Sequence, residues 1–584
     1  MANPLLTLMA MRPPEDPRAA QRRAALRRVA VKVPSDGPTT DAIFLAFRRM
    51  RGPLIVMLVT FALSILGLTL IPGVDDQGKP YRLTFFDAFY FISYTATTIG
   101  FGETPYTFTI AQRMWVSFAI YASVIGWAYA ISALFALLQD RSFREAVQVQ
   151  GFRRAVRRID EPFVILAGYG HAGRQVARTL DELRRRFVVL DDDRRRIDAL
   201  ATDQLTVDAP GLDADAANPR FLGLAGLGSE RCEAVLALTD DSETNLAIVM
   251  AVHLLRPDVP VIARCDDRLT AARMLDFEPA AILNPYDHYG TYLVLALQRP
   301  TTYQLVSWLM NRRGTRLPAR RDGLTDGRWV VTGDDRFARE VAADLRDAGL
   351  EVTLTKAKDG DPDVSEAVGF VAGSTSDATN LALAAHARRE RHDIFICVRQ
   401  STSRNAALLD AFDPDSVFVP TELVAKEALA RVVAPYLWGF IEQAIEQDDA
   451  WSAAMLQVIK RRCGSPTPST QVITLDQVSA PAVLRWLRHD ELSLGDLLRD
   501  PDDRARVAPL AALGLIREDH TLYAPDLSEP LRAGDRILLA GRESGFDILS
   551  GTLYSDSAVE YVATGRQVPS TWVWRVLTGT RLPR

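Results

Sequence analysis

The 584-residue sequence predicts two α-helical membrane segments with a re-entrant loop between them, followed by two α/β Rossmann-like domains and a small C-terminal α+β subdomain. Three observations predict this order. Two long uncharged stretches lie near the N-terminus, a glycine-rich turn follows an apolar run after them, and blocks of sequence recur later at one constant offset. The net charge of −5 gives no reason to expect a nucleic-acid partner.

The uncharged stretches cover residues 52–74 and 114–139. Each exceeds the ~20 residues that a helix needs to cross a bilayer. Between them, residues 83–97 are rich in aromatic side chains and carry a single charge, that of Asp87. This pattern predicts a short helix that enters the membrane and leaves it on the same side. The alternative is two membrane helices joined by an aromatic loop at the bilayer surface.

Residues 98–102, which read Thr-Ile-Gly-Phe-Gly, follow this aromatic stretch and are followed by Glu103. A row of backbone carbonyls can replace the hydration shell of a potassium ion. Aiming successive carbonyls at one axis needs backbone angles that glycine tolerates, because it has no Cβ. The alternating glycines fit this need, and a surface loop does not explain them. We therefore predict a two-helix membrane pore with a re-entrant pore loop.

These five residues resemble the filter signature of potassium channels, with Ile99 for the usual valine and Phe101 for the usual tyrosine. The resemblance implies a homotetramer whose four loops surround potassium ions. Potassium channels often bend the second helix at a glycine, a role that Gly126 can fill; the alternative is a packing glycine, which is common in membrane helices. The ion-binding residues that the resemblance implies are Thr98, Ile99, Gly100, Phe101 and Gly102.

Positive charge predicts the orientation. Residues 1–51 carry ten Lys or Arg and residues 141–158 carry six, whereas the loop between the membrane segments has three. The positive-inside rule then places both termini in the cytoplasm. Residues 39–50 combine apolar and basic side chains and suggest a helix at the membrane surface. The resemblance implies a multi-pass protein of a bacterial or archaeal type of plasma membrane.

A dinucleotide-binding fingerprint opens the next region. An apolar run over residues 163–167 predicts a strand buried on both faces. Residues 168–173 read Gly-Tyr-Gly-His-Ala-Gly, and a helical pattern and a second apolar run that ends at Asp191 follow them. The glycines permit a tight turn, close approach of a pyrophosphate and close helix packing, while Asp191 can bind ribose hydroxyls. This favours NAD or NADH; the alternative is the same fold with an empty or differently filled cleft.

Further strands are predicted over residues 205–208, 234–238 and 261–264, which gives a parallel sheet. Together with the helix start at residues 244–247, they resemble the domain that regulates potassium conductance, the RCK or TrkA-N family. The resemblance implies that nucleotides or ions bind this domain and act on a pore. The nucleotide-binding residues predicted from the fingerprint are Gly168, Tyr169, Gly170, His171, Ala172, Gly173 and Asp191, and the resemblance adds Asp208 and Arg264.

Blocks of this domain recur 135 residues later: residues 379–382 repeat 244–247, and Arg399 repeats Arg264. A second RCK domain is therefore predicted. Its glycine loop begins at Gly333, which is 165 residues after Gly168, so this copy lacks about 30 residues (165 − 135) before the matched blocks.

Two departures argue against NAD in the second copy. Asp335 replaces the glycine that would face the pyrophosphate, and Lys356 stands where the first copy has Asp191. Asp334 and Asp335 can instead hold calcium or another cation; the alternative is a turn with solvated carboxylates.

The predicted crossover helix at residues 286–311 resembles the element through which RCK domains pair, and a helix after Pro435 resembles its second copy. Near the end, a strand over residues 471–475, a helix over 480–487 and a Gly-Asp turn at 534–535 resemble the TrkA-C subdomain, while 551–584 are unassigned.

The predicted domains are a basic leader (1–50), a pore module (51–140), a linker (141–161), the first RCK domain with its crossover helix (162–311), a second linker (312–327), the second RCK domain (328–462) and the C-terminal region (463–584).

Two classes of function compete. The first is a ligand-gated potassium-selective channel, with a nonselective cation channel as its alternative because Ile99 and Phe101 depart from the commonest filter. The second is a membrane-tethered NAD-dependent oxidoreductase, which needs a proton-transfer residue near the nicotinamide. His171 is the candidate in the glycine loop, but an oxidoreductase leaves residues 98–102 unexplained. We therefore expect a channel and not an enzyme, with the lipid bilayer, a nucleotide and further copies of the chain as partners.

Overall fold

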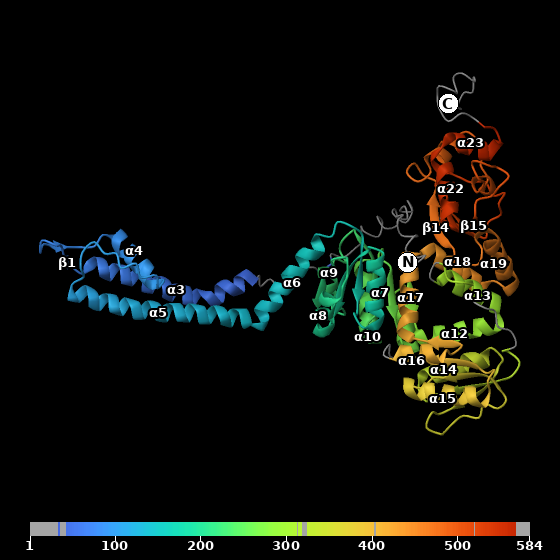
Figure 1. Cartoon of the computed structure of the whole chain (residues 1–584), viewed down its shortest axis with the longest axis horizontal. Coiled ribbons are helices and arrows are strands. Elements are labelled where there is room, and N and C mark those ends of the chain that lie inside the picture. The colour runs from blue at the N-terminus through green and yellow to red at the C-terminus, as the bar shows by residue number, and fades with distance from the viewer. Residues whose placement is uncertain are drawn as a thin grey trace, which may run out of the picture. The chain divides into compact units, whose positions relative to one another are not determined.

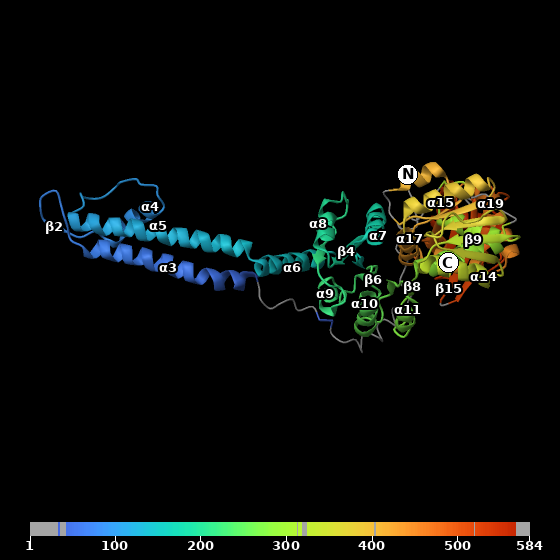
Figure 2. The ribbon, with the colours of Figure 1, turned by 90° about the horizontal axis from the view of Figure 1, so that it is seen from below.

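The computed structural model describes residues 33–34, 42–311, 314–317, 324–401, 405–518 and 520–567 of the chain. These residues form two compact units. One contains residues 34–159 together with 223–225, and the other contains 160–222 and the chain from 226 onward. Figures 1 and 2 show the elements of each unit in two views, and each unit is described separately below.

The first unit is built from two long helices that lie side by side, with a short helix at one end (Figures 1 and 2). The helix that was expected at the membrane surface over residues 39–50 is not separate, because α3 runs without a break from Ala42 through that region to Leu70. An ion pair of 2.7 Å joins Arg49, near the start of α3, to Asp140, which follows the end of α5. The elements are α3 (Ala42–Leu70), β1 (Gly73–Val74), β2 (Pro80–Tyr81), α4 (Phe85–Ala96), α5 (Ile110–Gln139) and α6 (Arg141–Arg157).

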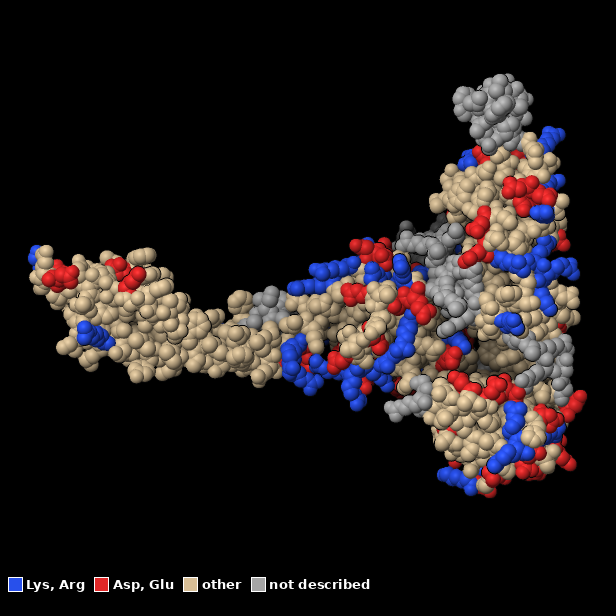
Figure 3. Space-filling view, in the orientation of Figure 1, with Lys and Arg blue, Asp and Glu red and all other residues tan. Residues whose placement is uncertain are grey.

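Two helical segments of this unit, Phe47–Leu70 and Ile110–Gln139, are long and apolar enough to cross a membrane, with 24 and 30 residues. Their apolar side chains face outward: Leu58 is 71% exposed and Phe118 is 61% exposed. A helix in the core of a soluble protein buries such side chains. Figure 3 shows an almost uncharged surface along the two helices, with the charges gathered at the end that carries the loops.

The second unit begins with a six-stranded parallel sheet in the order β5-β4-β3-β6-β7-β8. The continuous apolar runs of the sequence form its central strands, which are buried on both faces as predicted. The strands are β3 (Phe163–Ala167), β4 (Arg186–Asp191), β5 (Gly211–Asp213), β6 (Cys232–Ala237), β7 (Val261–Arg264) and β8 (Ala281–Leu283). The helices are α7 (His171–Glu182), α8 (Arg194–Thr202), α9 (Pro219–Leu224), α10 (Ser242–Leu255) and α11 (Arg268–Leu275).

The strand predicted over residues 205–208 is wrong. The Asp181 carboxylate accepts hydrogen bonds from the backbone N–H groups of Thr206 and Val207, at 3.0 and 2.7 Å, so this segment is tied to the end of α7. The third strand is β5, which begins only at Gly211. Asp208 consequently lies exposed in the preceding loop, and Asp213 takes the strand-end position beside Asp191.

A second α/β domain follows, with a five-stranded parallel sheet in the order β10-β9-β11-β12-β13. The interval between β4 and β6 is 40 residues (192–231), whereas that between β10 and β11 is 11 (356–366). The difference of 29 matches the predicted deletion and removes the counterparts of α8, β5 and α9. Its elements are β9 (Arg328–Thr332), α14 (Arg336–Asp347), β10 (Glu351–Thr355), β11 (Ala367–Ala372), α15 (Asp377–Glu390), β12 (Phe395–Arg399), α16 (Ala406–Phe412) and β13 (Ser416–Phe418).

The two α/β domains exchange helices. The single crossover helix expected over residues 286–311 is two helices, because Pro300 lacks the N–H that would continue the first and begins the second instead. The same break recurs at Pro435. The helix α12 packs against α14 of the second domain, and its counterpart α17 packs against α7 of the first (Figure 1). The helices are α12 (Pro285–Gln298), α13 (Pro300–Met310), α17 (Pro420–Val433), α18 (Pro435–Glu446) and α19 (Asp449–Cys463).

A four-stranded antiparallel sheet, in the order β14-β17-β15-β16, forms the C-terminal subdomain. The strand and the helix predicted near residues 471–475 and 480–487 are present, and Gly534 turns the chain into β17 with a φ of 87°. Residues 551–567, unassigned from the sequence, complete α22 and form α23; residues beyond 567 lie outside the described part. The elements are β14 (Ser469–Thr474), α20 (Pro481–Trp486), α21 (Leu494–Leu497), β15 (Leu510–Arg517), β16 (His520–Tyr523), β17 (Arg536–Gly541), α22 (Glu543–Tyr554) and α23 (Asp556–Thr564).

The exchange of helices makes Phe337 of α14 an anchor between the two domains. Its ring is fully buried, stacks on Phe418 at 4.7 Å and lies 5.7 Å from Tyr289 of α12. We expect Phe337→Ala to lower the free energy of unfolding by about 3–5 kcal/mol, because it removes an aromatic side chain from a packed core. Urea unfolding of the purified full-length protein, followed by tryptophan fluorescence, measures this. The control Leu408→Ala removes a side chain that is 60% exposed and should change stability by less than about 0.5 kcal/mol.

Candidate functional site

The pore loop follows α4 and has an alternating backbone. Thr98, Gly100 and Gly102 have φ values of 62°, 69° and 73°, while Ile99 and Phe101 between them do not have positive φ. Alternating left-handed and right-handed residues aim successive backbone groups at one concave side, whereas a regular strand points them to opposite sides. The sequence prediction that glycine at alternate positions permits this geometry agrees with the structure. Thr98 adopts it although a β-branched residue rarely does.

Tyr94 of α4 holds this loop at both ends, a role that the sequence did not reveal. Its carbonyl oxygen accepts hydrogen bonds from the N–H groups of Ile99 and Gly100, at 2.9 and 3.2 Å. Its hydroxyl donates to the carbonyl of Glu103 at 2.7 Å, and its ring lies edge-on to Phe101, with 6.0 Å between the ring centroids. One side chain of the short helix thereby fixes the backbone on either side of the alternating residues.

Gly126 lies buried within α5, which runs through it as continuous helix. A Cβ added there would meet a single neighbour within 4 Å, the Thr60 hydroxyl at 4.0 Å. Close packing inside one chain therefore does not require glycine at this position. The hinge role that the resemblance implied stays a prediction.

The glycine loop of the first α/β domain has the expected geometry. Gly168 has a φ of 98°, and a Cβ there would lie 2.8 Å from the backbone of Leu238 and Thr239. A Cβ on Gly173 would lie 1.9 Å from the Gly168 carbonyl oxygen. These two glycines are thus required for the turn and for the close approach of α7. Gly170 caps the N-terminus of α7 and has room for a Cβ, so it is open to the cleft.

The other residues of the loop divide between core and surface. Tyr169 is fully buried and turns away from the cleft, since its hydroxyl donates to Asp203 at 2.8 Å. Burial, followed by this hydrogen bond, raises the pKa of Tyr169. Ala172 is buried in the core, and His171 is exposed at the first position of α7.

Asp191 is 4% exposed at the end of β4 and anchors the glycine loop. Its carboxylate accepts hydrogen bonds from the N–H groups of Tyr169 and Asp193, at 2.5 and 2.8 Å, and pairs with Arg196 at 3.4 Å. The ribose contact predicted for Asp191 stays a prediction, and the structure adds a second role, that of holding the loop backbone.

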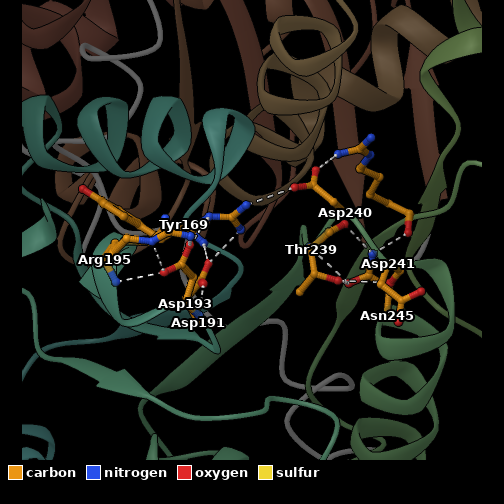
Figure 4. A network of polar contacts seen from close by, with 10 residues as sticks. Tyr169, Asp191, Asp193, Arg195, Thr239, Asp240, Asp241 and Asn245 are labelled. Atoms are coloured by element: carbon orange, nitrogen blue, oxygen red, sulfur yellow. Dashed lines mark hydrogen bonds and ion pairs between the residues drawn. The ribbon is translucent and has the colours of Figure 1, made fainter. Parts of the chain in front are cut away.

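Across the strand ends runs a chain of charges that we call the arginine bridge, formed by Arg196, Asp240, Arg264 and Asp266. Asp240 pairs with Arg264 at 2.6 Å on one side and with Arg196 at 3.4 Å on the other. Arg264 also binds Asp266 through two hydrogen bonds of 2.9 and 2.8 Å. Burial opposes the charge of Arg264, but these two carboxylates outweigh it and raise its pKa. Figure 4 labels Asp240 of this bridge, together with Tyr169 of the loop and Asp191.

A buried asparagine positions this bridge and explains the recurring sequence block. Asn245 donates to the carbonyls of Thr239 and Arg264, at 3.0 and 2.9 Å, and so ties the ends of β6 and β7 together (Figure 4). In the second domain Asn380 makes the same bonds to Ser374 and Arg399, each at 2.9 Å.

In the second domain the arginine at the strand ends is already paired from the glycine loop. Asp335, at the position of Gly170, pairs with Arg399, at the position of Arg264. The Arg399 guanidinium also lies over the ring of Phe337, which occupies the position of Ala172. Lys356 is exposed after β10. Because Asp335 is engaged by an arginine, it is poorly placed to bind calcium, and the part of the chain that the structure describes contains no group of three or more His, Cys, Asp and Glu that could hold a metal ion.

Comparisons with known proteins find relatives of the chain by sequence and solved channel structures that match it. The chain resembles an uncharacterized protein of Methanothermus fervidus (25% identity; 41% of this chain and 37% of the relative). It also resembles Potassium channel protein 1 of Methanocaldococcus jannaschii (23% identity; 40% of this chain and 66% of the relative). Both alignments thus span less than two thirds of the relatives. A solved structure described as the GsuK channel bound to NAD matches 88% of this chain and 99% of its own, at 13% identity and a TM-score of 0.43.

Two family models match the regions that the sequence singled out. An ion channel family matches residues 54–140, and the TrkA-N domain matches residues 164–285. The chain is therefore a membrane protein that joins a channel domain to a TrkA-N, or RCK, domain. With the second α/β domain that the structure describes, the chain combines a two-helix channel domain with two α/β domains in tandem.

The contacts of Tyr94 predict its effect on ion conduction. We expect Tyr94→Phe to keep the carbonyl contacts of the pore loop but to lose the hydrogen bond to Glu103, worth about 0.5–1.5 kcal/mol. Single-channel recording in planar bilayers should then show shorter open bursts and about a twofold to tenfold lower occupancy of the conducting state. The control Tyr121→Phe alters a tyrosine of α5 that is 72% exposed and should leave the bursts unchanged. Unchanged bursts in Tyr94→Phe would show that this hydroxyl does not hold the loop.

Proposed function

We propose that the protein is a potassium-selective channel whose pore is opened or closed by a nucleotide bound to the first RCK domain. The observation that carries the pore assignment is the alternation of positive φ at Thr98, Gly100 and Gly102. Four such loops around an axis form rings of carbonyl oxygens that can replace the hydration shell of potassium. A homotetramer is therefore part of the proposal, with both termini in the cytoplasm of a bacterial or archaeal cell.

The nucleotide assignment rests on the glycine loop and on the charge around it. Gly168 and Gly173 shape the turn, Gly170 leaves the backbone accessible, and the N-terminus of α7 favours phosphate. Arg196 and Arg264 lie on the same side of the sheet, where both pair with the exposed Asp240 and can donate to phosphate if Asp240 moves away. We propose NAD or NADH as the ligand, held by the first domain and not by the second, whose Arg399 is already paired with Asp335.

The proposal treats the nucleotide as a regulator and not as a cosubstrate. An oxidoreductase would place a proton-transfer group beside the nicotinamide. His171 starts the helix whose N-terminus would face the phosphates, so it is poorly placed for that task. A nonselective cation channel of the same build remains the alternative that the next experiment separates.

Reversal potentials test the selectivity. Purified protein in planar bilayers under a potassium–sodium gradient should reverse close to the potassium equilibrium potential. Gly100→Ala should abolish conduction or remove selectivity, because a Cβ strains the positive φ of 69° at this position. Gly151→Ala, which has open space around it and lies in α6, is the matched control and should conduct as the wild type does. Sodium passing as readily as potassium through the wild-type protein would refute the selectivity.

Calorimetry on the full-length protein in detergent tests the nucleotide site. One NAD site per chain is expected. Gly170→Asp gives the first domain the aspartate that the second domain has at the equivalent position, Asp335. Its Cβ fits because the nearest atoms would lie 3.6 Å away. The new carboxylate should compete with the phosphates for Arg264 and weaken NAD binding about tenfold to a hundredfold, the loss of one charged hydrogen bond. Lys356→Ala should leave binding unchanged. Two equivalent sites, or a site lost with Lys356→Ala, would contradict the assignment.

A further inference from the structure

A carboxylate lies where a phosphate would approach the first RCK domain. The second glycine of the fingerprint is the point at which a pyrophosphate comes close to the backbone. A Cβ built on that residue, Gly170, would lie 3.6 Å from the Asp240 carboxylate oxygen Oδ2 and 3.6 Å from Arg196 Nη1. Asp240 therefore borders the phosphate position and points its charge into it.

Asp240 can leave this position without stranding a buried charge. Its side chain is 62% exposed, whereas that of Arg264 is 11% exposed. Arg264 binds Asp266 through Nε and Nη2 and gives only Nη1 to Asp240. If Asp240 swings away, Arg264 stays paired and oriented, with Nη1 free to donate to another anion. Arg196 likewise keeps Asp191 as a partner.

The second RCK domain supports this interpretation, because its carboxylate stands at the other of two equivalent positions. Where the first copy has Gly170 and Asp240, the second has Asp335 and Thr375, at offsets of 165 and 135 residues. Each copy thus places a carboxylate against the equivalent arginine from a different position, and Arg264 has Asp266 as a further partner. Asp335 is 24% exposed against a partner that is 8% exposed, so the second copy holds its carboxylate far more deeply.

We propose that Asp240 is an internal competitor of the ligand and determines which ligands the first RCK domain accepts. The proposal rests on the proposed function, because it requires that a nucleotide binds this cleft. Phosphate oxygens displace Asp240 and take over Nη1 of Arg264 and Nη2 of Arg196. Two arginines released together favour a ligand with two adjacent phosphates, so the ligand class is a nucleoside diphosphate or a dinucleotide and not a nucleoside or a monophosphate.

Nucleotide titrations of the full-length protein and its Asp240→Asn variant test the proposal. Asn keeps the shape of the side chain but removes the charge that competes with the ligand. We expect ADP and NAD to bind about tenfold more tightly to Asp240→Asn, AMP to gain less, and adenosine to gain nothing. The conservative variant Asp240→Glu keeps the charge and should stay close to the wild type in its ligand preference.

A control on β6, the strand that precedes Asp240, separates this effect from a change in net charge. Glu233 lies near the start of β6, at the opposite edge of the sheet from Asp240, and pairs with Arg185 at 2.8 Å. Glu233→Gln removes the same unit of charge and should leave the affinity for ADP unchanged. Equal gains in Glu233→Gln and Asp240→Asn would overturn the proposal.

The remaining outcomes are distinct. If the wild-type protein binds ADP or NAD and Asp240→Asn binds them equally or more weakly, Asp240 is not a competitor, while the proposed nucleotide site stands. If adenosine gains as much as ADP, the effect does not act through phosphate and the proposal fails. If neither protein binds any of the four ligands, both the competitor and the nucleotide site are wrong. Binding of ADP by Asp240→Asn alone would support the proposal strongly.

Discussion

A buried arginine, at the end of β7 in the first RCK domain and of β12 in the second, is the constraint on which both domains depend. Removing a guanidinium from water costs several kcal/mol unless a carboxylate accompanies it, and breaking such a pair is strongly destabilising. Arg264 and Arg399 are 11% and 8% exposed, and each is placed by a buried asparagine that binds its carbonyl. What differs between the copies is the position of the anion, and the proposed difference in nucleotide binding rests on it.

Under the proposed function, the effect of a nucleotide on the pore is limited by its binding energy. A ligand shifts an equilibrium only by its difference in affinity for the two states. To move a pore from about 1% to 99% open, the ligands must bind the open state ~10⁴-fold more tightly in total than the closed state. In a channel of four chains, a tenfold preference at each of four sites multiplies to that value. A modest difference in affinity at each site is therefore sufficient for the proposed control.

The sequence predicted the features that depend on backbone geometry. The glycines at 100, 102, 168 and 173 mark positive φ or a close approach, and both can be inferred from residue type and spacing. Features that depend on side chains meeting across the fold could not be predicted. Asp240 and Arg264 are 24 residues apart, and Tyr94 reaches Glu103 only because α4 ends as it does. The misplaced strand at residues 205–208 has the same origin, since Asp181 captures backbone that would otherwise extend.

The most direct test of the account is the open probability of single channels while nucleotide is applied to the cytoplasmic face. Wild-type protein and Gly170→Asp should be recorded side by side in planar bilayers, with potassium as the charge carrier. At a nucleotide concentration near the dissociation constant of the wild type, the account predicts that NAD or ADP changes the open probability of the wild type and has far less effect on Gly170→Asp, while both conduct potassium selectively. An equal response of the two proteins, or no response of the wild type, would contradict control of the pore from the first RCK domain.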